Sequence, residues 1–242
     1  MKKIIIANWK MNPKTELEAI KLTEKTDHKN LVIAPPFPFL GSIRKTQKLS
    51  RLSGQDIFWE EKGAYTSQVS ASQIKSMGAE FVILGHSERR ALGETNEMVA
   101  KKTIAAISSG LIPIVCIGET LEEKNSGKSE ASIFQKLDSI IPALQKLKSG
   151  KVIFTYEPVW AISTQKDARA DTPENALSII LKIKEKVLDS ELKGLKFQFI
   201  YGGSVDCLNA EGFLRHNEIE GALVGGASLR PEDINQILKL SV

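Results

Sequence analysis

Short apolar runs recur along the chain, separated by longer segments that mix apolar and polar residues. The runs are Ile4–Ala7, Leu31–Ala34, Leu52–Gln55, Phe81–Leu84, Ile112–Ile117, Val152–Tyr156, Phe197–Tyr201 and Ala222–Val224. Most are continuous rather than alternating, which is typical of β-strands covered on both faces. The pattern therefore predicts eight buried strands, with the weakest signal at Leu52–Gln55.

Amphipathic helices are predicted between these runs. The clearest begins after Thr172, a residue type favoured as N-cap, with Pro173 in its first turn. Its apolar residues recur at helical spacing, at Ala176, Ile180, Ile183 and Val187. Further helices are expected at Lys101–Ile107, at Ile133–Leu147 and from Pro231 onward, where Ile234, Ile237 and Leu238 would be buried.

The order of these elements predicts the fold class. Strands alternate with helices, and no Pro-, Gly- or Ser-rich linker interrupts them, as expected for parallel βαβ units. Eight units in 242 residues match an α/β (β/α)8 TIM barrel, in which eight parallel strands are each followed by a helix. We expect residues 1–242 to form this single catalytic domain, although periodicity alone leaves a doubly wound sheet open.

Composition narrows the class of protein without naming a function. Hydrophobic residues make up 42% of the chain and charged residues 26%, which argues against a disordered chain or a coiled coil. The net charge is only +4, and Lys and Arg form no run of five, so no nucleic-acid partner is expected. The apolar stretch near the N-terminus is too short for a signal peptide, and none is long enough to span a membrane.

The chain has two cysteines, Cys116 and Cys207. They are too few for a disulfide framework or a four-ligand zinc site. Free thiols favour a reducing compartment, so we expect a cytoplasmic protein.

Reactive side chains directly follow several predicted strands. Parallel α/β folds place their sites at the carboxyl ends of the strands, so these residues should meet at one rim. They are Asn8 and Lys10 after the first run, His86 after the fourth, Glu157 after the sixth, Gly202, Gly203 and Ser204 after the seventh, and Gly225 and Gly226 after the eighth.

The two glycine pairs indicate an anion site. Glycine lets backbone N–H groups approach an anion closely, and the loops after strands 7 and 8 commonly bind phosphate in such barrels. The chain contains no dinucleotide-binding fingerprint, P-loop or H-E-x-x-H motif, so neither a cofactor nor a metal is expected.

Each reactive residue also has a structural interpretation. Lys10 could be an ordinary surface lysine, and His86 a satisfied structural histidine. Glu157 is harder to explain in that way, because burial directly after a strand should raise its pKa, as suits a general base. Residues 88–90, Glu-Arg-Arg, are expected to form an ion-pair cluster, and Cys116 should pack in the core rather than act as a nucleophile.

Longer motifs occur in order along nearly the whole chain. They are Ala7–Asn12, Gly54–Asp56, Gly63–Thr66, Leu84–Arg90, Cys116–Glu122, Tyr156–Ile162, Tyr201–Val205 and Leu223–Leu229. Any one of them could arise by chance, but their combination at compatible spacing is highly specific. Together they resemble the triosephosphate isomerase family.

The resemblance implies a barrel that interconverts dihydroxyacetone phosphate and D-glyceraldehyde 3-phosphate in glycolysis and gluconeogenesis, with no cofactor. Glu157 would be the base that moves a proton between C1 and C2, and His86 the neutral electrophile that polarises the carbonyl. Lys10 would offset negative charge, and Asn8 would help to hold the substrate. The phosphate would bind the backbone N–H groups of Ser163, Ser204, Gly225 and Gly226. The side chains of Ile162 and Leu223 would close over Glu157 and shield it from water.

The resemblance also implies a lid after the sixth strand, formed by Pro158, Val159, Trp160, Ala161, Ile162, Ser163, Thr164, Gln165 and Lys166. The usual family pattern is Ile-Gly-Thr-Gly-Lys, whereas Ser163 and Gln165 replace both glycines here. The segment is also about three residues longer, with the extra residues near Arg169–Asp171. We therefore expect an active enzyme with altered lid kinetics.

A homodimer is a further implication of the resemblance. Tyr65 and Thr66 match a loop that in this family inserts into a neighbouring subunit. The usual Thr-Gly-Glu of that loop is Thr66-Ser67-Gln68 here, so Arg89 loses one expected carboxylate partner.

Two other functions remain open at the level of sequence. An aldolase-like barrel would use Lys10 as a Schiff-base amine, although an amine beside Asn8 and a phosphate site should stay charged. A phosphate-binding module would be expected to lack Glu157 or His86, yet both are present. Because the lid is modified, a barrel with altered catalysis is the remaining alternative.

Overall fold

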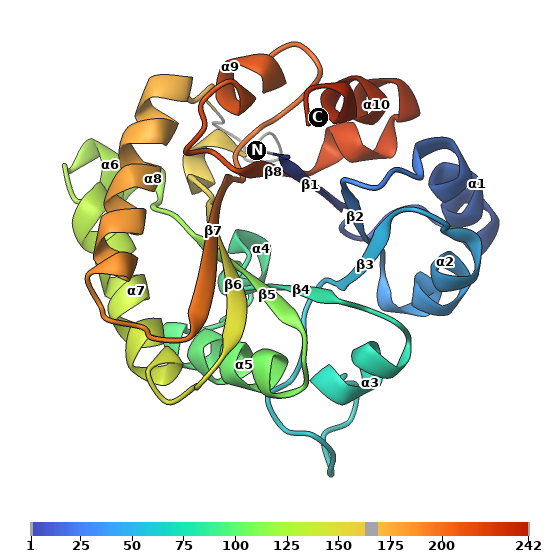
Figure 1. Ribbon diagram of the computed structural model, residues 1–242, viewed down its shortest axis with the longest axis horizontal. Helices are drawn as coiled ribbons and strands as arrows, with labels where there is room; N and C mark the ends of the chain where they lie inside the picture. The colour runs from blue at the N-terminus through green and yellow to red at the C-terminus, as the bar shows by residue number, and fades with distance from the viewer. Residues whose placement is uncertain (1, 163–168, 242) are drawn as a thin grey trace.

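Eight parallel strands close into a barrel in the computed structural model, which describes residues 2–162 and 169–241 (Figure 1). The strands are β1 (Ile4–Asn8), β2 (Leu31–Ala34), β3 (Arg51–Gly54), β4 (Phe81–Leu84), β5 (Ile112–Ile117), β6 (Gly150–Tyr156), β7 (Leu195–Tyr201) and β8 (Gly221–Val224). Pairing of β1 with β8 closes the sheet. The closed barrel confirms the predicted TIM barrel and excludes the doubly wound sheet, which was the alternative.

Helices surround the barrel (Figure 1). The α-helices are α1 (Glu16–Thr26), α2 (Leu40–Thr46), α3 (Ala71–Ser76), α4 (Ser87–Ala91), α5 (Asn96–Ser108), α6 (Leu121–Asn125), α7 (Ser129–Leu144), α8 (Pro173–Leu188), α9 (Ala210–Leu214) and α10 (Pro231–Lys239). Short 3₁₀ helices are η1 (Phe37–Phe39), η2 (Val159–Ala161) and η3 (Gly226–Leu229). Among the described residues, no helix is long and apolar enough to cross a membrane.

The predicted start of α8 is confirmed. Thr172 is the N-cap, its side chain accepts a hydrogen bond from the backbone N–H of Asn175 at 3.2 Å, and Pro173 opens the helix. The predicted apolar stripe is buried. By contrast, α5 begins at Asn96, before its predicted start at Lys101. The Thr95 side chain caps the first turn, whereas the prediction relied on an apolar stripe that starts later.

Two apolar clusters make up the core. The smaller contains only strand residues and fills the barrel interior, including Ile6, Phe81 and Cys116. The larger joins the outward faces of the strands to the helices. Cys116 is thus buried in the core, as its sequence position predicts, and burial raises the pKa of its thiol well above the ordinary value. The packed interior leaves the rim at the carboxyl ends of the strands for the site.

Candidate active site

A cavity of about 200 Å³ lies at the carboxyl ends of the strands. Predicted site residues in its wall are Asn8, Lys10, His86, Glu157, Ile162, Ser204, Leu223, Gly225 and Gly226. The structure therefore brings together the predicted reactive and substrate-binding residues that it describes. Four predicted residues, Ser163, Thr164, Gln165 and Lys166, lie outside the described part of the chain.

Glu157 is held in place by both its backbone and its side chain. It follows β6 directly, and its backbone N–H donates to the carbonyl of Ile117 at 2.8 Å. A Cβ on Gly118 would lie 1.8 Å from the Glu157 carbonyl oxygen, so this close approach requires glycine. The buried carboxylate accepts hydrogen bonds from the Ser87 backbone N–H at 3.1 Å and the Ser87 hydroxyl at 3.0 Å.

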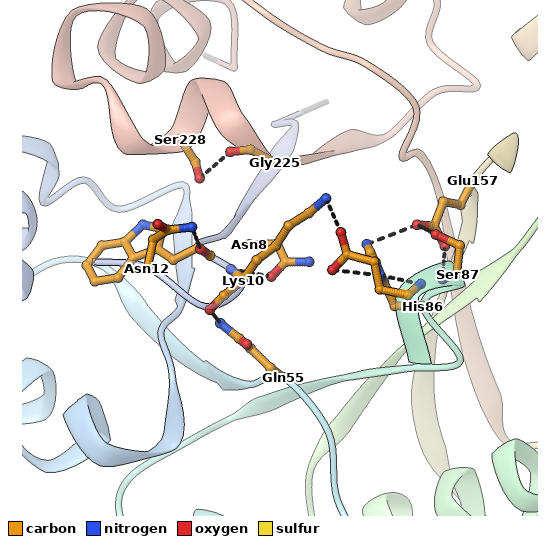
Figure 2. A network of polar contacts seen from close by, with 11 residues as sticks. Asn8, Lys10, Asn12, Gln55, His86, Ser87, Glu157, Gly225 and Ser228 are labelled. Atoms are coloured by element: carbon orange, nitrogen blue, oxygen red, sulfur yellow. Dashed lines mark hydrogen bonds and ion pairs between the residues drawn. The ribbon is translucent and has the colours of Figure 1, made fainter. Parts of the chain in front are cut away.

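His86 lies against this carboxylate, with Nε2 3.0 Å from Glu157 Oε1 (Figure 2). Its other ring nitrogen, Nδ1, accepts a hydrogen bond from the backbone N–H of Glu88 at 3.2 Å. An acceptor nitrogen carries no proton, so the neutral ring has its proton on Nε2. His86 thereby presents a donor to the cavity.

The two buried groups shift each other's pKa. Burial raises the pKa of Glu157, but the charge of His86 and the hydrogen bonds from His86 and Ser87 outweigh it, so the pKa is lowered. Burial lowers the pKa of His86, but the charge and hydrogen bond of Glu157 outweigh it, so that pKa is raised. Burial does raise the Glu157 pKa, as expected, and is the largest single influence, but the expected net rise is wrong for this structure because the charge and hydrogen bonds of His86 and Ser87 together outweigh burial.

Lys10 has a strained backbone with φ of 53°, a conformation that costs free energy for a non-glycine residue and clusters at functional sites. Asn8 Oδ1 accepts from the Lys10 N–H at 3.0 Å, and Gln55 Nε2 donates to the Lys10 carbonyl at 2.8 Å. The ammonium contacts Glu88 Oε1 at 2.7 Å, and the side chain is only 18% exposed (Figure 2). Lys10 is thus a fixed cation in the cavity wall rather than a surface lysine.

Residues 88–90 do not form the expected ion-pair cluster. Glu88 pairs with Lys10, while Arg89 Nη2 contacts Asp56 Oδ2 at 3.0 Å. Arg90 donates to backbone carbonyl oxygens and to the side-chain oxygen of Asn96. The prediction is wrong because consecutive residues of a helix point in different directions.

The glycine loop after β8 presents backbone donors to the cavity. The N–H groups of Gly225 and Gly226 have no acceptor among the described residues, and Gly226 opens η3. The Ser228 hydroxyl donates to the Gly225 carbonyl at 2.6 Å, which fixes the loop (Figure 2). The Ser204 N–H, by contrast, donates to the Ala161 carbonyl at 3.1 Å and is not free in this structure.

The described lid residues, Pro158–Ile162, pack against the end of β5. Trp160 Nε1 donates to Glu119 Oε1 at 2.8 Å, and the Tyr156 hydroxyl donates to the same oxygen at 3.1 Å. Lys124 Nζ lies 3.2 Å from the centre of the Trp160 ring, a cation–π contact. These contacts fix the segment immediately after Glu157.

The structure adds three polar residues that the sequence analysis did not place in the site. They are Gln55, Ser87 and Glu88. Each follows a strand closely, which is the same signal that identified the others. Their contacts with Lys10 and Glu157 join residues far apart in the chain, so only the fold reveals them. No group of three or more His, Cys, Asp or Glu side chains that could hold a metal is found within residues 2–162 and 169–241.

Comparison with known proteins identifies the family of the chain. A family model described as triosephosphate isomerase matches residues 3–241. Proteins of that name include one from Dictyoglomus thermophilum, 42% identical over 98% of this chain and 99% of its own. The protein from Caldanaerobacter subterraneus is 40% identical over 97% of this chain and 98% of its own. The protein from Geotalea uraniireducens is 39% identical over 99% of both chains. The chain therefore belongs to the triosephosphate isomerase family and is an isomerase.

Proposed function

We propose that the cavity interconverts dihydroxyacetone phosphate and D-glyceraldehyde 3-phosphate, with Glu157 as base and His86 as electrophile. The observation that carries this assignment is the buried 3.0 Å contact between Glu157 Oε1 and His86 Nε2. Moving a proton between adjacent carbons requires a base for the carbon and a proton donor for the oxygens. The pair supplies both at one wall of the cavity.

Glu157 starts the reaction as a carboxylate, because its lowered pKa keeps it ionised. It takes the proton from the carbon beside the carbonyl, and the C–H electron pair forms the carbon–carbon double bond of the enediolate. The carbonyl oxygen receives the displaced electron pair and accepts a hydrogen bond from His86 Nε2. His86 gives its Nε2 proton to this oxygen and takes the hydroxyl proton from the oxygen on the deprotonated carbon, whose electron pair forms the new carbonyl. The electron pair of the carbon–carbon double bond then takes the proton back from Glu157 at the former carbonyl carbon, which completes the isomerisation.

His86 becomes a neutral donor when Glu157 turns to the substrate. In the free protein the carboxylate raises the pKa of His86, while burial and the charge of Lys10 lower it. Loss of the Glu157 contact removes the largest influence that raises this pKa, so burial and the charge of Lys10 are then opposed only by the charge of Glu88. The Glu88 N–H stays on Nδ1. The backbone at a helix N-terminus also disfavours the positive charge that a second proton would place on the ring.

Lys10, Asn8 and the glycine loop hold the substrate in this proposal. The phosphate binds the free N–H groups of Gly225 and Gly226, and Lys10 exchanges Glu88 for substrate oxygens. Ser204 joins the phosphate site only after releasing the Ala161 carbonyl. The contribution of Ser163 stays a prediction.

A lid of residues 158–166 would exclude water from the enediolate. Ile162 and Leu223, both almost fully buried, lie in the cavity wall that includes Glu157. Apolar cover of this kind strengthens electrostatic interactions inside a site. The altered lid kinetics expected from the sequence remain a prediction.

A cytoplasmic homodimer acting in glycolysis and gluconeogenesis is the proposed setting. The loop with Tyr65 and Thr66 is exposed and projects from the barrel between β3 and α3 (Figure 1). A second cavity, of about 310 Å³, adjoins Lys10 and includes Arg89 in its wall. Met11, the residue after Lys10, is 92% exposed, and a partner subunit at this place would remove its apolar side chain from water.

The aldolase-like alternative is disfavoured by the surroundings of Lys10. A Schiff-base lysine needs an amine that readily loses its proton. Lys10 Nζ is instead held in an ion pair, 2.7 Å from a Glu88 carboxylate oxygen, which is not the surrounding of a free amine nucleophile.

A coupled isomerase assay of the wild type beside Glu157→Gln tests the proposal. We expect the variant to lose activity by a factor on the order of 10²–10⁴, as removal of a general base does. Glu174→Gln, at an exposed carboxylate of α8, is the matched control and should remain fully active. An inactive wild type, or a Glu157→Gln variant as active as the control, would overturn the mechanism.

A further inference from the structure

The wall of the substrate cavity contains a cation besides Lys10 that has no role in the mechanism above. Arg230 directly follows η3 and lies in that wall together with Gly225 and Gly226, whose free N–H groups are proposed to bind phosphate. Its side chain is 59% exposed and therefore accessible to a ligand. Residues 225–230 thus bring neutral donors and a positive charge to the same cavity.

The guanidinium of Arg230 is held by Asp233, which lies in the first turn of α10. Arg230 Nε and Nη2 both contact Asp233 Oδ2. The other oxygen, Asp233 Oδ1, accepts a hydrogen bond from Cys207 Sγ at 3.2 Å, so Asp233 is itself tied to the loop after β7. Because a guanidinium has five N–H donors, its contact with one carboxylate oxygen leaves donors for another anion.

Exposed arginine–carboxylate pairs are often ordinary features of a protein surface, and they contribute little to stability. Arg215 is such a case, since its side chain is 60% exposed and pairs with Glu174 at 3.2 Å. Arg215 is not among the described residues of the cavity wall. Arg230 therefore differs from Arg215 in its place in the wall, rather than in its exposure or its pairing.

The charges around the cavity give this place a consequence for an anionic substrate. Apart from Arg230, the Lys, Asp and Glu residues of the described wall are Lys10, Glu157 and Asp206. The ammonium of Lys10 is already paired with Glu88 at 2.7 Å. A phosphate monoester carries a charge of about −1.5 to −2 at neutral pH, so without Arg230 the two carboxylates of the wall would disfavour its binding.

The small size of the cavity brings Arg230 within range of a bound phosphate. The cavity measures only about 200 Å³, and screening at physiological ionic strength acts over about 8 Å. A phosphate held by Gly225 and Gly226 therefore interacts with the charge of the guanidinium.

We propose that Arg230 is a substrate-binding residue, whose guanidinium, held by Asp233, supplies positive charge to the phosphate group at the glycine loop. The inference rests on the proposed function, because it concerns the phosphate of the same substrate. The isomerisation does not change the phosphate, so a contact with it stabilises the bound substrate and the transition state equally. Loss of such a contact raises KM and leaves kcat nearly unchanged.

Arg230→Gln tests the proposal, with Arg215→Gln as the matched control. Both variants remove one positive charge from an arginine of nearly equal exposure that pairs with a carboxylate. In Arg230→Gln we expect about a tenfold rise in KM for D-glyceraldehyde 3-phosphate, as for loss of a hydrogen bond to a charged group, with kcat within about twofold of the wild type. The dissociation constant of inorganic phosphate, measured by phosphorus NMR titration, should rise by a similar factor. The control should match the wild type.

Arg230→Lys keeps the positive charge and should keep both constants within about threefold of the wild type. A lysine variant as weak as Arg230→Gln would overturn the role of the charge. A rise of less than about threefold in either constant for Arg230→Gln, or an equal rise in the control, would overturn the inference. Phosphate binding requires no turnover, so this result is separate from a fully active Glu157→Gln, which would overturn the proposed function instead.

Discussion

The charge state of Glu157 depends on the atoms around it more than on its burial. Its carboxylate has lost nearly all contact with water, which by itself favours the protonated form. Three donors, from His86 and the backbone and hydroxyl of Ser87, favour the ionised form instead. The base is therefore ready to accept a proton before the substrate arrives.

The contact between His86 and Glu157 can be tested by measuring the pKa of His86. In the wild type His86 should titrate above its ordinary pKa of 6.5, since Glu157 stabilises the imidazolium. The ion pair with Glu157 raises the pKa of His86 in the folded protein, so it contributes to the free energy of unfolding. That contribution is complete well below pH 6.5 and is lost as the pH rises through the His86 pKa of the folded protein.

Titration of isotope-labelled histidine by NMR measures this pKa, with His28 and His216 as internal references. In Glu157→Gln the His86 pKa should fall below its wild-type value, because the raising charge of Glu157 is lost while burial still lowers the pKa. An unchanged His86 pKa in that variant would contradict the assigned ion pair.

At the scale of elements, α8 connects the candidate lid to the barrel. Its N-cap, Thr172, directly follows Asp171, and its buried stripe of Ala176, Ile180, Ile183 and Val187 anchors it in the core. The cap and the stripe have different roles. The stripe supplies most of the helix stability, and the cap fixes where the helix begins.

Removing the capping hydroxyl should therefore have a moderate cost. Thr172→Ala is expected to lower the free energy of unfolding by about 1 kcal/mol, because the Asn175 N–H loses its acceptor. Urea unfolding measures the change. Thr172→Ser keeps the hydroxyl and should lose clearly less, so equal losses in the two variants would show that the cap is not the cause.

At the scale of the whole molecule, one chain closes the barrel and brings the base and electrophile together. Sequence departures nevertheless fall on the loop proposed to contact a second subunit. Ser67 has a φ of 70° where the family usually has glycine, and Arg89 finds its carboxylate partner in Asp56 of the same chain. The loop thus keeps its turn, while Arg89 no longer depends on the missing glutamate.

Light scattering at micromolar concentration should give about twice the chain mass of 26.7 kDa. Thr66→Arg, at the exposed loop, should shift the population toward monomer and lower activity, because the proposed interface would bury an unpaired charge. Glu211→Arg, at an exposed position on α9, is the control and should remain dimeric. A fully active monomeric wild type would contradict the dimer.

Eight strands, the capped start of α8 and the rim on which the reactive residues lie were all predictable from the amino-acid sequence. These follow from local hydrophobic periodicity and from the topology that such periodicity imposes. Glu157, His86 and Lys10 can therefore be assigned to the rim from their positions directly after the apolar runs.

The partners of these residues are visible only in the folded barrel. Ser87 and Glu157 are 70 residues apart in the chain, and Lys10 and Glu88 are 78 apart. Electrostatic interactions depend on distances of a few ångströms in space, which local patterns do not encode. For that reason the direction of the Glu157 pKa shift and the partners of residues 88–90 emerged only from the fold.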